Sequence, residues 1–234
     1  IKTNINGAMN VIDACIDHDI KKVVALSTDK ASKPVSLYGA TKLASDKMFV
    51  ASNAYSGEHK TRFSVVRYGN VMGSRGSVIP FFIKEKKNGV LPITDNRMTR
   101  FMITLEEGVE LVWKAFDDMC GGEIYVKKIP SMKVTDLAIA IDKNAIQKVI
   151  GIRPGEKLHE EMIGEDDSAY TYEYDGYYKI LPAINNWSLS EKLIKNGKKV
   201  EEGFSYTSDN NREWMSIATL QEWIKNNKNK IGRI

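Results

Sequence analysis

In the first part of the chain, the spacing of the apolar residues predicts helices and strands in alternation. Residues Ile1–His18 carry apolar side chains at close to helical spacing, which predicts an amphipathic helix. The apolar runs Val23–Leu26 and Phe63–Arg67 predict two buried strands, and a helix is expected between them from about Gly39 to Asn53. Strands that are apolar throughout and are separated by a helix indicate a parallel sheet covered on both faces, and hence an α/β fold.

The pattern changes after the second predicted strand. Residues 68–77 contain three glycines in ten positions, a composition typical of active-site loops in which the backbone approaches a ligand closely. A helix is predicted for Val78–Asn88, followed by an extended stretch over Pro92–Ile103. The capping-box pair Thr104 and Glu107 predicts a further helix that continues to about residue 119.

The remaining elements alternate less regularly. We expect a strand over Glu123–Val126, a short helix over Val134–Asp142, a strand over Lys148–Ile152 and, after Pro154, a helix over Gly155–Ile163. Tyrosines at positions 170, 172 and 174 alternate with polar residues, which suits an edge strand or a hairpin. A platform for stacking nucleic-acid bases is the alternative, but basic residues are not interleaved with these tyrosines.

Chemistry-bearing side chains gather directly after the first predicted strand. Ser27 and Thr28 end the strand, Asp29 and Lys30 follow, and Ser27 is expected to satisfy backbone groups. On the next helix Tyr38 and Lys42 are four residues apart, so they lie on one face. The ammonium stabilises the phenolate, which favours acid/base chemistry between an alcohol and a ketone. An exposed helical Tyr–Lys pair without a catalytic role is the alternative.

Composition and charge narrow the class of protein. The chain has 234 residues, 42% of them hydrophobic and 27% charged, as in an ordinary globular protein. A net charge of +4 is weak evidence for a nucleic-acid partner, and no nucleic-acid-binding motif occurs, so no such partner is expected. No apolar run is long enough to span a bilayer, so we expect no membrane partner.

The cysteines and the residue types that bind metals bear on the cellular compartment and on a possible metal site. Cys15 and Cys120 are far apart and form no CxxC motif, which favours an intracellular, cytoplasmic protein with Cys15 as a small core residue. No His/Cys/Asp cluster has the spacing of a metal site, so no metal is expected, and His159 is interpreted as a packing or helix-surface residue.

Four short segments follow one another in a distinctive order: Ser27–Ala31, Leu37–Lys42, Arg67–Val71 and Arg153–Glu160. They resemble the extended, sugar-nucleotide-modifying branch of the short-chain dehydrogenase/reductase superfamily. Together they are most similar to the UDP-N-acetylglucosamine 4,6-dehydratases of the inverting, polysaccharide-biosynthesis type. Tyr38 resembles the soluble members that begin pseudaminic acid synthesis, because membrane-anchored relatives commonly carry Met there.

The resemblance implies a Rossmann-like, doubly wound fold divided into two parts. Residues 1–77 would form the C-terminal half of an NADP-binding domain that carries the catalytic motif. Residues 78–234 would form mostly a UDP-sugar-binding lobe, with a strand and helix near 99–119 returning to the first domain. Family members carry a Gly-rich cofactor loop in a preceding segment that this sequence does not contain. A non-catalytic sugar-nucleotide-binding fragment is therefore one alternative.

The implied reaction oxidises C4 of the sugar, eliminates water across C5 and C6, and returns the hydride to C6, with NADP (or NAD) bound throughout. Tyr38 would take the C4 hydroxyl proton, and Lys42 would assist it. Asp29 would act as the acid at the C6 hydroxyl and Lys30 as the base at C5, while Thr28 would position the substrate. An ordinary Asp–Lys turn after a strand is the alternative reading of that pair.

Further residues are assigned to cofactor and substrate by the same resemblance. Because a guanidinium binds phosphate bidentately, Arg97, Arg100 and Arg153 are candidate cations for the diphosphate. A local ion pair is the alternative for Arg153 and Glu156. The expected cofactor contacts are Tyr38, Lys42, Tyr68, Val71, Gly73, Ser74 and Arg75. The expected substrate contacts are Asn70, Val78, Thr94, Arg97, Arg153 and Glu156.

The predicted activity is therefore that of a lyase, a UDP-GlcNAc 4,6-dehydratase that inverts C5. Its product would be a UDP-4-keto-6-deoxy-HexNAc for bacterial surface glycan or pseudaminic acid synthesis. A UDP-sugar 4-epimerase is the enzymatic alternative, since it shares Tyr38 and Lys42 but does not need Asp29 and Lys30. A homo-oligomer is expected, although helix surfaces that pack between subunits resemble those that pack on a sheet.

Overall fold

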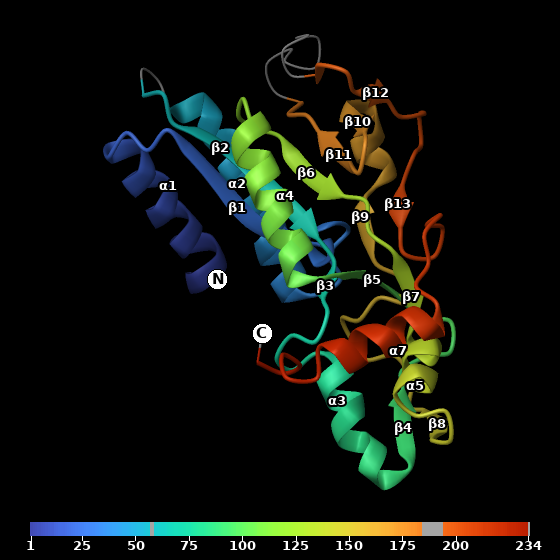
Figure 1. Cartoon of the computed structure of the whole chain (residues 1–234). Coiled ribbons are helices and arrows are strands. Elements are labelled where there is room, and N and C mark those ends of the chain that lie inside the picture. Colours follow the sequence, from blue (N-terminus) through green and yellow to red (C-terminus); the bar gives the residue numbers. More distant parts are fainter. Residues whose placement is uncertain (57–58, 184–193, 234) are drawn as a thin grey trace. The chain divides into compact units, whose positions relative to one another are not determined.

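The computed structural model of this chain describes residues 1–56, 59–183 and 194–233 (Figure 1). The chain forms two compact units, each assembled from three stretches. The first unit consists of Ile1–Tyr68, Val109–Lys128 and Glu161–Tyr206. The second unit consists of Gly69–Gly108, Ile129–Glu160 and Thr207–Ile234. The chain thus leaves the first unit at residue 68 and returns to it twice, while the predicted functional division at residue 77 stays a prediction.

The first unit contains a mixed sheet whose described strands run in the order β1-β2-β6-β11-β10-β12. β1 and β2 are parallel, β2 and β6 are parallel, and the hairpin β10–β11 joins β6 in antiparallel fashion. The predicted α/β fold with parallel strands is confirmed, as is the tyrosine-rich hairpin. The strands are β1 (Lys22–Thr28), β2 (Arg62–Tyr68), β6 (Ile124–Lys127), β10 (Thr171–Tyr174), β11 (Tyr177–Ile180) and β12 (Lys198–Lys199).

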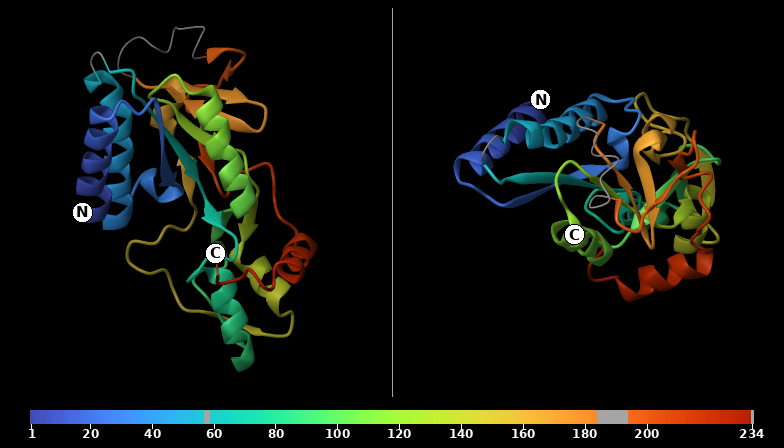
Figure 2. Two further views of the ribbon diagram at one scale, coloured as in Figure 1. Left: turned by 60° about the vertical axis from the view of Figure 1, so that its left-hand side comes forward. Right: turned by 90° about the horizontal axis from the view of Figure 1, so that it is seen from above.

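Helices cover both faces of the parallel strands. α1 (Gly7–Asp17), which continues a π-helical turn over Lys2–Asn6, lies beside α2 (Leu37–Tyr55) on one face, and α4 (Leu105–Asp118) lies on the other (Figure 2). α2 begins earlier than predicted because the Ser36 hydroxyl accepts a hydrogen bond from the Gly39 amide at 3.2 Å. The predicted capping box of α4 is confirmed by reciprocal hydrogen bonds between Thr104 and Glu107.

The two parallel strands β1 and β2 differ in burial. The side chains of Phe63, Val65 and Val66 in β2 are fully buried, as predicted. In β1 the prediction of a buried strand over Val23–Leu26 is wrong, because its first three residues are only partly buried and Leu26 is 52% exposed. β1 is the terminal strand of the sheet in the part of the chain that the structure describes, so it has a strand neighbour on one side.

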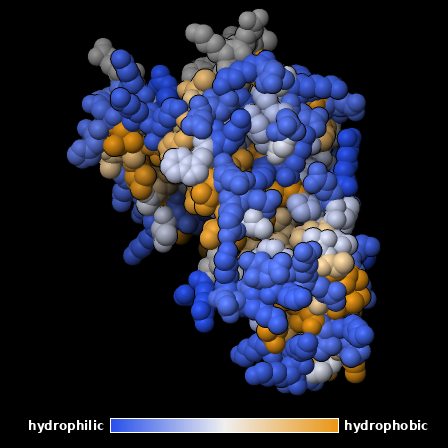
Figure 3. All heavy atoms as spheres, viewed as in Figure 1, coloured by the Kyte–Doolittle hydropathy of each residue, from blue (hydrophilic) through white to orange (hydrophobic). Residues whose placement is uncertain are grey.

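The second unit is built around a methionine-rich core. β3 (Asn70–Val71), β5 (Thr99–Ile103) and β7 (Ser131–Lys133) form one small sheet, and β4 (Val90–Ile93) pairs in parallel with β8 (Ile146–Val149). Figure 3 shows apolar surface over β8, where Ile146 is 68% exposed. The helices of this unit are α3 (Val78–Glu85), the 3-10 turn Lys86–Asn88, α5 (Val134–Ile141) and α7 (Ile217–Asn226). The buried methionines are Met72, Met98, Met102 and Met132.

The helix predicted over Gly155–Ile163 is wrong. The segment contains a turn in which Gly155 has a φ of +79°, followed by the strand β9 (Glu161–Ile163). The guanidinium of Arg100 donates hydrogen bonds to the carbonyl oxygens of Lys157 and Leu158, which a helix would have paired with its own amides. A 3-10 helix (Glu165–Tyr170) follows β9, and the short strand β13 (Tyr206–Thr207) lies at the boundary of the two units.

Candidate active site

The predicted catalytic residues of the first unit lie at the carboxyl ends of the parallel strands. The register of β1 and β2 places Thr28 opposite Tyr68 at these ends. A single 3-10 turn, Asp29–Ala31, follows β1 and is here named the catalytic turn. The Thr28 hydroxyl accepts a hydrogen bond from the Lys30 amide at 3.4 Å and so caps this turn. Ligands of open α/β sheets bind at this edge, outside the carboxyl ends of the strands.

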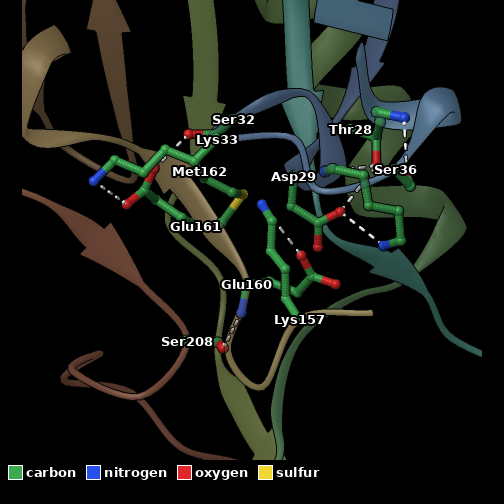
Figure 4. A network of polar contacts seen from close by, with 12 residues as sticks. Thr28, Asp29, Ser32, Lys33, Ser36, Lys157, Glu160, Glu161, Met162 and Ser208 are labelled. Carbon is green, nitrogen blue, oxygen red and sulfur yellow. Dashed lines mark hydrogen bonds and ion pairs between the residues drawn. The ribbon is translucent and has the colours of Figure 1, made fainter. Parts of the chain in front are cut away.

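Asp29 is fully buried in the catalytic turn (Figure 4). Its Oδ1 accepts hydrogen bonds from the Thr28 hydroxyl and from the Lys30 ammonium, each at 2.9 Å. Its Oδ2 is also buried and has no hydrogen-bond partner within the described ranges. Because a buried polar atom without a partner is costly, this oxygen is a candidate acceptor for a hydrogen bond from a ligand.

Tyr38 and Lys42 occupy the first turns of α2. Tyr38 is 52% exposed, so its phenol is accessible to a ligand. The Lys42 ammonium donates a hydrogen bond to the carbonyl oxygen of Leu26 at 2.7 Å, which anchors the lysine to the end of β1. A phenol and an anchored ammonium one helical turn apart form a set of donors suited to a sugar or ribose hydroxyl.

Gly39 brings α2 into contact with the catalytic turn. A Cβ atom at this position would lie 2.3 Å from the carbonyl oxygen of Lys30 and 3.0 Å from a Pro34 side-chain atom. Only the absence of a side chain permits this approach. The two predicted catalytic pairs, Asp29 with Lys30 and Tyr38 with Lys42, are therefore held together by a backbone contact.

A buried polar network lies behind these residues. The Ser27 hydroxyl donates to Asp46 Oδ2 at 2.6 Å, and Arg67 donates to the same oxygen at 3.4 Å. Burial raises the pKa of Asp46, although the Arg67 charge and the Ser27 hydrogen bond act against that rise. The expectation that Ser27 satisfies backbone groups is wrong, because its hydroxyl binds this carboxylate.

Sequence reasoning missed Asp46 and Arg67 as parts of the site. A signal for Asp46 was present, since it follows Lys42 by four residues and so extends the helix face that carries Tyr38 and Lys42. Tyr68, a predicted cofactor contact, is half-buried at the end of β2. Burial raises the pKa of Tyr68, and a smaller contribution from Tyr38 indicates that the two phenols lie near each other.

The second unit contains a pocket of about 580 Å³, a volume within the usual range for small-molecule sites. Its lining includes apolar side chains of α3 and the methionine-rich core, together with Arg100. The structure brings five of the six predicted substrate contacts together in this lining. They are Asn70, Val78, Thr94, Arg153 and Glu156.

The three candidate arginines differ in their surroundings. Arg153 is exposed, lines the pocket and forms no ion pair within the described ranges. Arg100 also lines the pocket, but its guanidinium is buried and pairs with Glu156 at 3.5 Å. Arg97 lies outside the lining and contacts both carboxylate oxygens of Asp95, whose pKa these hydrogen bonds lower to about 2. Of the three, Arg153 is the cation that remains available to an anionic ligand.

The Gly-rich loop after β3 packs against the C-terminal part of the chain. Val71 lines the pocket, and Gly73 has a φ of +72°, which favours glycine. A Cβ atom on Gly73 would lie 2.9 Å from the Trp223 ring, and the Gly232 amide donates to the Gly73 carbonyl oxygen at 2.7 Å. This packing joins residues far apart in the sequence, and no local pattern predicts it. Ser74 and Arg75, the other predicted cofactor contacts of this loop, directly follow Gly73.

The residues that the structure describes contain no group of His, Cys, Asp and Glu side chains arranged to hold a metal ion. None of their helices combines the length and the apolar character needed to cross a bilayer. His159 does not lie on a helix, and its Nδ1 is 2.8 Å from the Thr99 hydroxyl.

Comparisons with known proteins give a consistent result. Residues 1–182 match the family described as polysaccharide biosynthesis protein. UDP-N-acetylglucosamine 4,6-dehydratase (inverting) of Campylobacter jejuni subsp. jejuni serotype O:2 is 59% identical over 232 residues, which cover 96% of this chain and 69% of that protein. UDP-glucose 4-epimerase of Rickettsia akari is 37% identical over 241 residues, with coverages of 97% and 70%. The X-ray structure of Pen from Bacillus thuringiensis has a TM-score of 0.83 at 35% identity and covers 96% of this chain and 67% of that one.

Proposed function

The chain belongs to the polysaccharide biosynthesis family and, within it, to the inverting UDP-N-acetylglucosamine 4,6-dehydratases, and on this premise we propose that it is a lyase that dehydrates UDP-N-acetylglucosamine. The observation that carries the proposal is the catalytic turn. Asp29, with a buried oxygen that has no partner in the described residues, and Lys30 lie against the helix of Tyr38 and Lys42. An epimerase needs the second pair alone, whereas a dehydratase needs both.

A nicotinamide dinucleotide is the cofactor that this chemistry requires, and we propose NADP rather than NAD. When bound, it would accept the hydride that leaves C4 of the sugar and would supply it again to C6, while a proton is added at C5. The exposed Tyr38 phenol and the anchored Lys42 ammonium fit the hydroxyl groups of its ribose. Tyr68 and the loop residues Val71–Arg75 are the further contacts proposed for it. Gly73 in this loop has no side chain and adopts a positive φ, so the backbone can approach a ligand closely.

Oxidation at C4 requires a base at the C4 hydroxyl. In the proposed mechanism the Tyr38 phenolate accepts that proton, and the ammonium of Lys42 stabilises the phenolate. The hydrogen bond of Lys42 to the Leu26 carbonyl fixes the ammonium without neutralising it. The resulting C4 ketone acidifies the proton on C5.

Elimination then needs a base at C5 and an acid at the C6 oxygen. Lys30, as the free amine, takes the C5 proton, and the electron pair of the C5–H bond forms the C5–C6 double bond. The C6–O bond breaks, and Asp29, as the carboxylic acid, donates a proton so that water leaves. Asp29 Oδ2 is the oxygen proposed for this role because it has no protein donor among the described residues.

The pocket of the second unit is proposed as the site of the UDP moiety. Apolar residues such as Val78 and Phe81 offer a surface for the base, and Thr94 and Asn70 offer polar groups. Arg153 is the cation proposed for the diphosphate, since a guanidinium binds phosphate oxygens bidentately. Arg100 and Glu156 support the pocket wall through their ion pair.

A product assay tests the proposal. The full-length natural protein would be incubated with UDP-N-acetylglucosamine and NADP, and the products would be identified by NMR. The expected product is a UDP-4-keto-6-deoxy-HexNAc, which suits synthesis of bacterial surface glycans. A C4 epimer alone would assign the protein to the epimerases instead. In Lys30→Ala we expect elimination to stop while calorimetry still detects UDP-sugar binding, and continued turnover would place the C5 base elsewhere.

A further inference from the structure

We propose that Glu161 is a positioning residue that holds the catalytic turn in the geometry needed for elimination. The inference rests on the proposed dehydratase function and adds a residue outside the predicted catalytic motif. Glu161 lies on β9, far from the catalytic turn in sequence, and its side chain is only 11% exposed. No sequence pattern singled it out.

The carboxylate of Glu161 contacts the two residues that follow the catalytic turn. Its Oε1 accepts a hydrogen bond from the Ser32 hydroxyl at 2.8 Å, and its Oε2 lies 3.2 Å from the Lys33 ammonium. Both side chains point toward Glu161 in the close view (Figure 4). Each carboxylate oxygen therefore fixes a different residue at the exit of the turn.

The backbone at this exit is strained. Lys33 has a φ of +39°, a region that residues with a side chain seldom occupy. Such conformations persist where the surroundings impose them, and they cluster at functional sites. The Ser32 amide also donates to the Asp29 carbonyl oxygen at 3.3 Å and closes the turn. Holding Ser32 and Lys33 therefore holds the position of Asp29.

Glu161 is itself held by rigid elements. The carbonyl oxygen of the next residue, Met162, accepts a hydrogen bond from Arg67 at 2.8 Å, and Arg67 reaches Asp46 on α2. A Cβ atom on Gly164 would lie 3.0 Å from Glu161 Oε1 and 3.6 Å from the Lys33 side chain. Glycine at this position leaves room for the ion pair. β9 therefore supports the catalytic turn, and the hydrogen bond from Arg67 anchors β9 to β2.

This arrangement predicts a selective effect on the two halves of the reaction. Glu161 contacts the exit of the turn that carries Asp29 and Lys30, which act in elimination. The pair proposed to oxidise C4 has two further anchors that do not involve Glu161, the Ser36 cap of α2 and the hydrogen bond from Lys42 to the Leu26 carbonyl. Loss of the Glu161 carboxylate is expected to slow elimination more than oxidation.

The test compares Glu161→Gln with wild type in the full-length holoenzyme under single-turnover conditions. Absorbance of the reduced nicotinamide reports C4 oxidation, and exchange of the C5 proton with solvent deuterium reports the first event of elimination. We expect elimination to slow about 10- to 100-fold, oxidation to change less than about 3-fold, and a 4-keto sugar that retains its C6 hydroxyl to accumulate. KM should stay within about 2-fold of wild type.

Two further variants keep the test decisive. Lys33→Met removes only the ion pair from an exposed side chain, so it is expected to fold and to show the same selective slowing at about 3- to 10-fold. Glu222→Gln removes an exposed carboxylate from α7 of the second unit and should leave both steps unchanged.

The outcomes separate the two proposals. If Glu161→Gln and Lys33→Met eliminate water at the wild-type rate, or slow both steps equally with a lower melting temperature, the positioning role is overturned. If wild-type protein yields a C4 epimer or no product, the dehydratase function itself fails, whatever the variants do.

Discussion

The catalytic turn of the first unit is built from residues close in sequence, whereas the pocket of the second unit is built from residues that are far apart. The proposed catalytic pairs come from one continuous stretch, Asp29–Lys42, in which Gly39 lies close to the Lys30 carbonyl oxygen. The pocket takes its lining from four stretches, residues 70–84, 92–102, 132–134 and 150–156. The proposed reacting groups are thus positioned by contacts between residues close in sequence, whereas the proposed binding groups come from distant parts of the chain.

The two regions also differ in burial. Asp29 is fully buried and tightly surrounded, while Arg153 is exposed at the pocket. Chemistry is sensitive to displacements of a fraction of an ångström, so its groups need rigid supports. Binding of a charged ligand tolerates a mobile cation, because electrostatic attraction falls off slowly with distance. Substitutions in the turn should therefore cost far more than substitutions in the pocket.

The largest effect is expected for Tyr38→Phe, which removes the phenolic oxygen and leaves the ring. General acid–base catalysis contributes about 10²- to 10⁴-fold to rates, so kcat for dehydration should fall by that factor. Stability should not change, since the side chain is 52% exposed. Steady-state turnover and thermal unfolding measure the two effects. A loss below about 10-fold would place the C4 base at another residue.

The next largest effect is expected for Gly39→Ala, which tests the short-range contact directly. A methyl group 2.3 Å from the Lys30 carbonyl oxygen forces the helix and the turn apart, and overpacking of this kind costs about 1–3 kcal/mol. Urea unfolding measures the cost. Gly108→Ala on α4 is the matched control, because nothing lies within 4 Å of its added methyl. The control should be neutral or stabilising by up to about 1 kcal/mol, and equal losses in both variants would deny the contact any special role.

A third prediction concerns the pH dependence of the first unit. Burial raises the pKa of Asp118, but hydrogen bonds from Lys195, Lys179 and Tyr125 outweigh it and hold the value at about 2. Because this lies below the value in an unfolded chain, the stabilisation is present above about pH 4 and is lost as the pH falls toward about 2.

Urea unfolding between pH 5 and pH 2 should show a loss of about 2 kcal/mol from this group. In Asp118→Asn that component of the pH dependence should disappear. A variant curve that keeps the full slope of wild type would show that other carboxylates carry the acid sensitivity.

The smallest effect is expected for the pocket arginines. Arg153→Ala should weaken UDP-sugar binding about 10-fold through the loss of one charge-assisted contact. Arg97→Ala, the matched control, should change affinity less than about 2-fold, because Arg97 is engaged with Asp95 outside the pocket lining. Calorimetry with the UDP-sugar measures both, and a larger effect of Arg97 would move the diphosphate site.

The catalytic turn depends on residues close in sequence, so local patterns could indicate where it lies. The apolar run that ends at Leu26 and the i,i+4 spacing of Tyr38 and Lys42 indicated its place, and the resemblance implied the roles of Asp29 and Lys30. The capping box of α4 was predicted for the same reason, since it involves only Thr104 and Glu107. The segment after Pro154 was mispredicted as a helix because Arg100, more than fifty residues away, binds its carbonyl groups.

Partners far apart in sequence account for the other misses. Glu161 on β9 contacts Ser32 and Lys33, which lie more than a hundred residues earlier in the chain, and no periodicity in the sequence indicates that contact. Ser27 was assigned to backbone groups because the position of Asp46 behind it depends on how α2 packs on β1. Arg97 and Arg100 are similar in sequence context, and only the fold shows which of them faces the pocket.

Among the described residues no donor reaches Asp29 Oδ2, and this has a consequence for directed evolution. A buried carboxylate oxygen that has no hydrogen-bond donor until a ligand binds lowers the free energy of unfolding of the unliganded protein. Replacing Asp29 with a residue that leaves no unpaired oxygen is therefore expected to raise the melting temperature while ending dehydration. A library screened for heat resistance alone would accumulate substitutions at position 29, so such a screen needs a parallel selection for product.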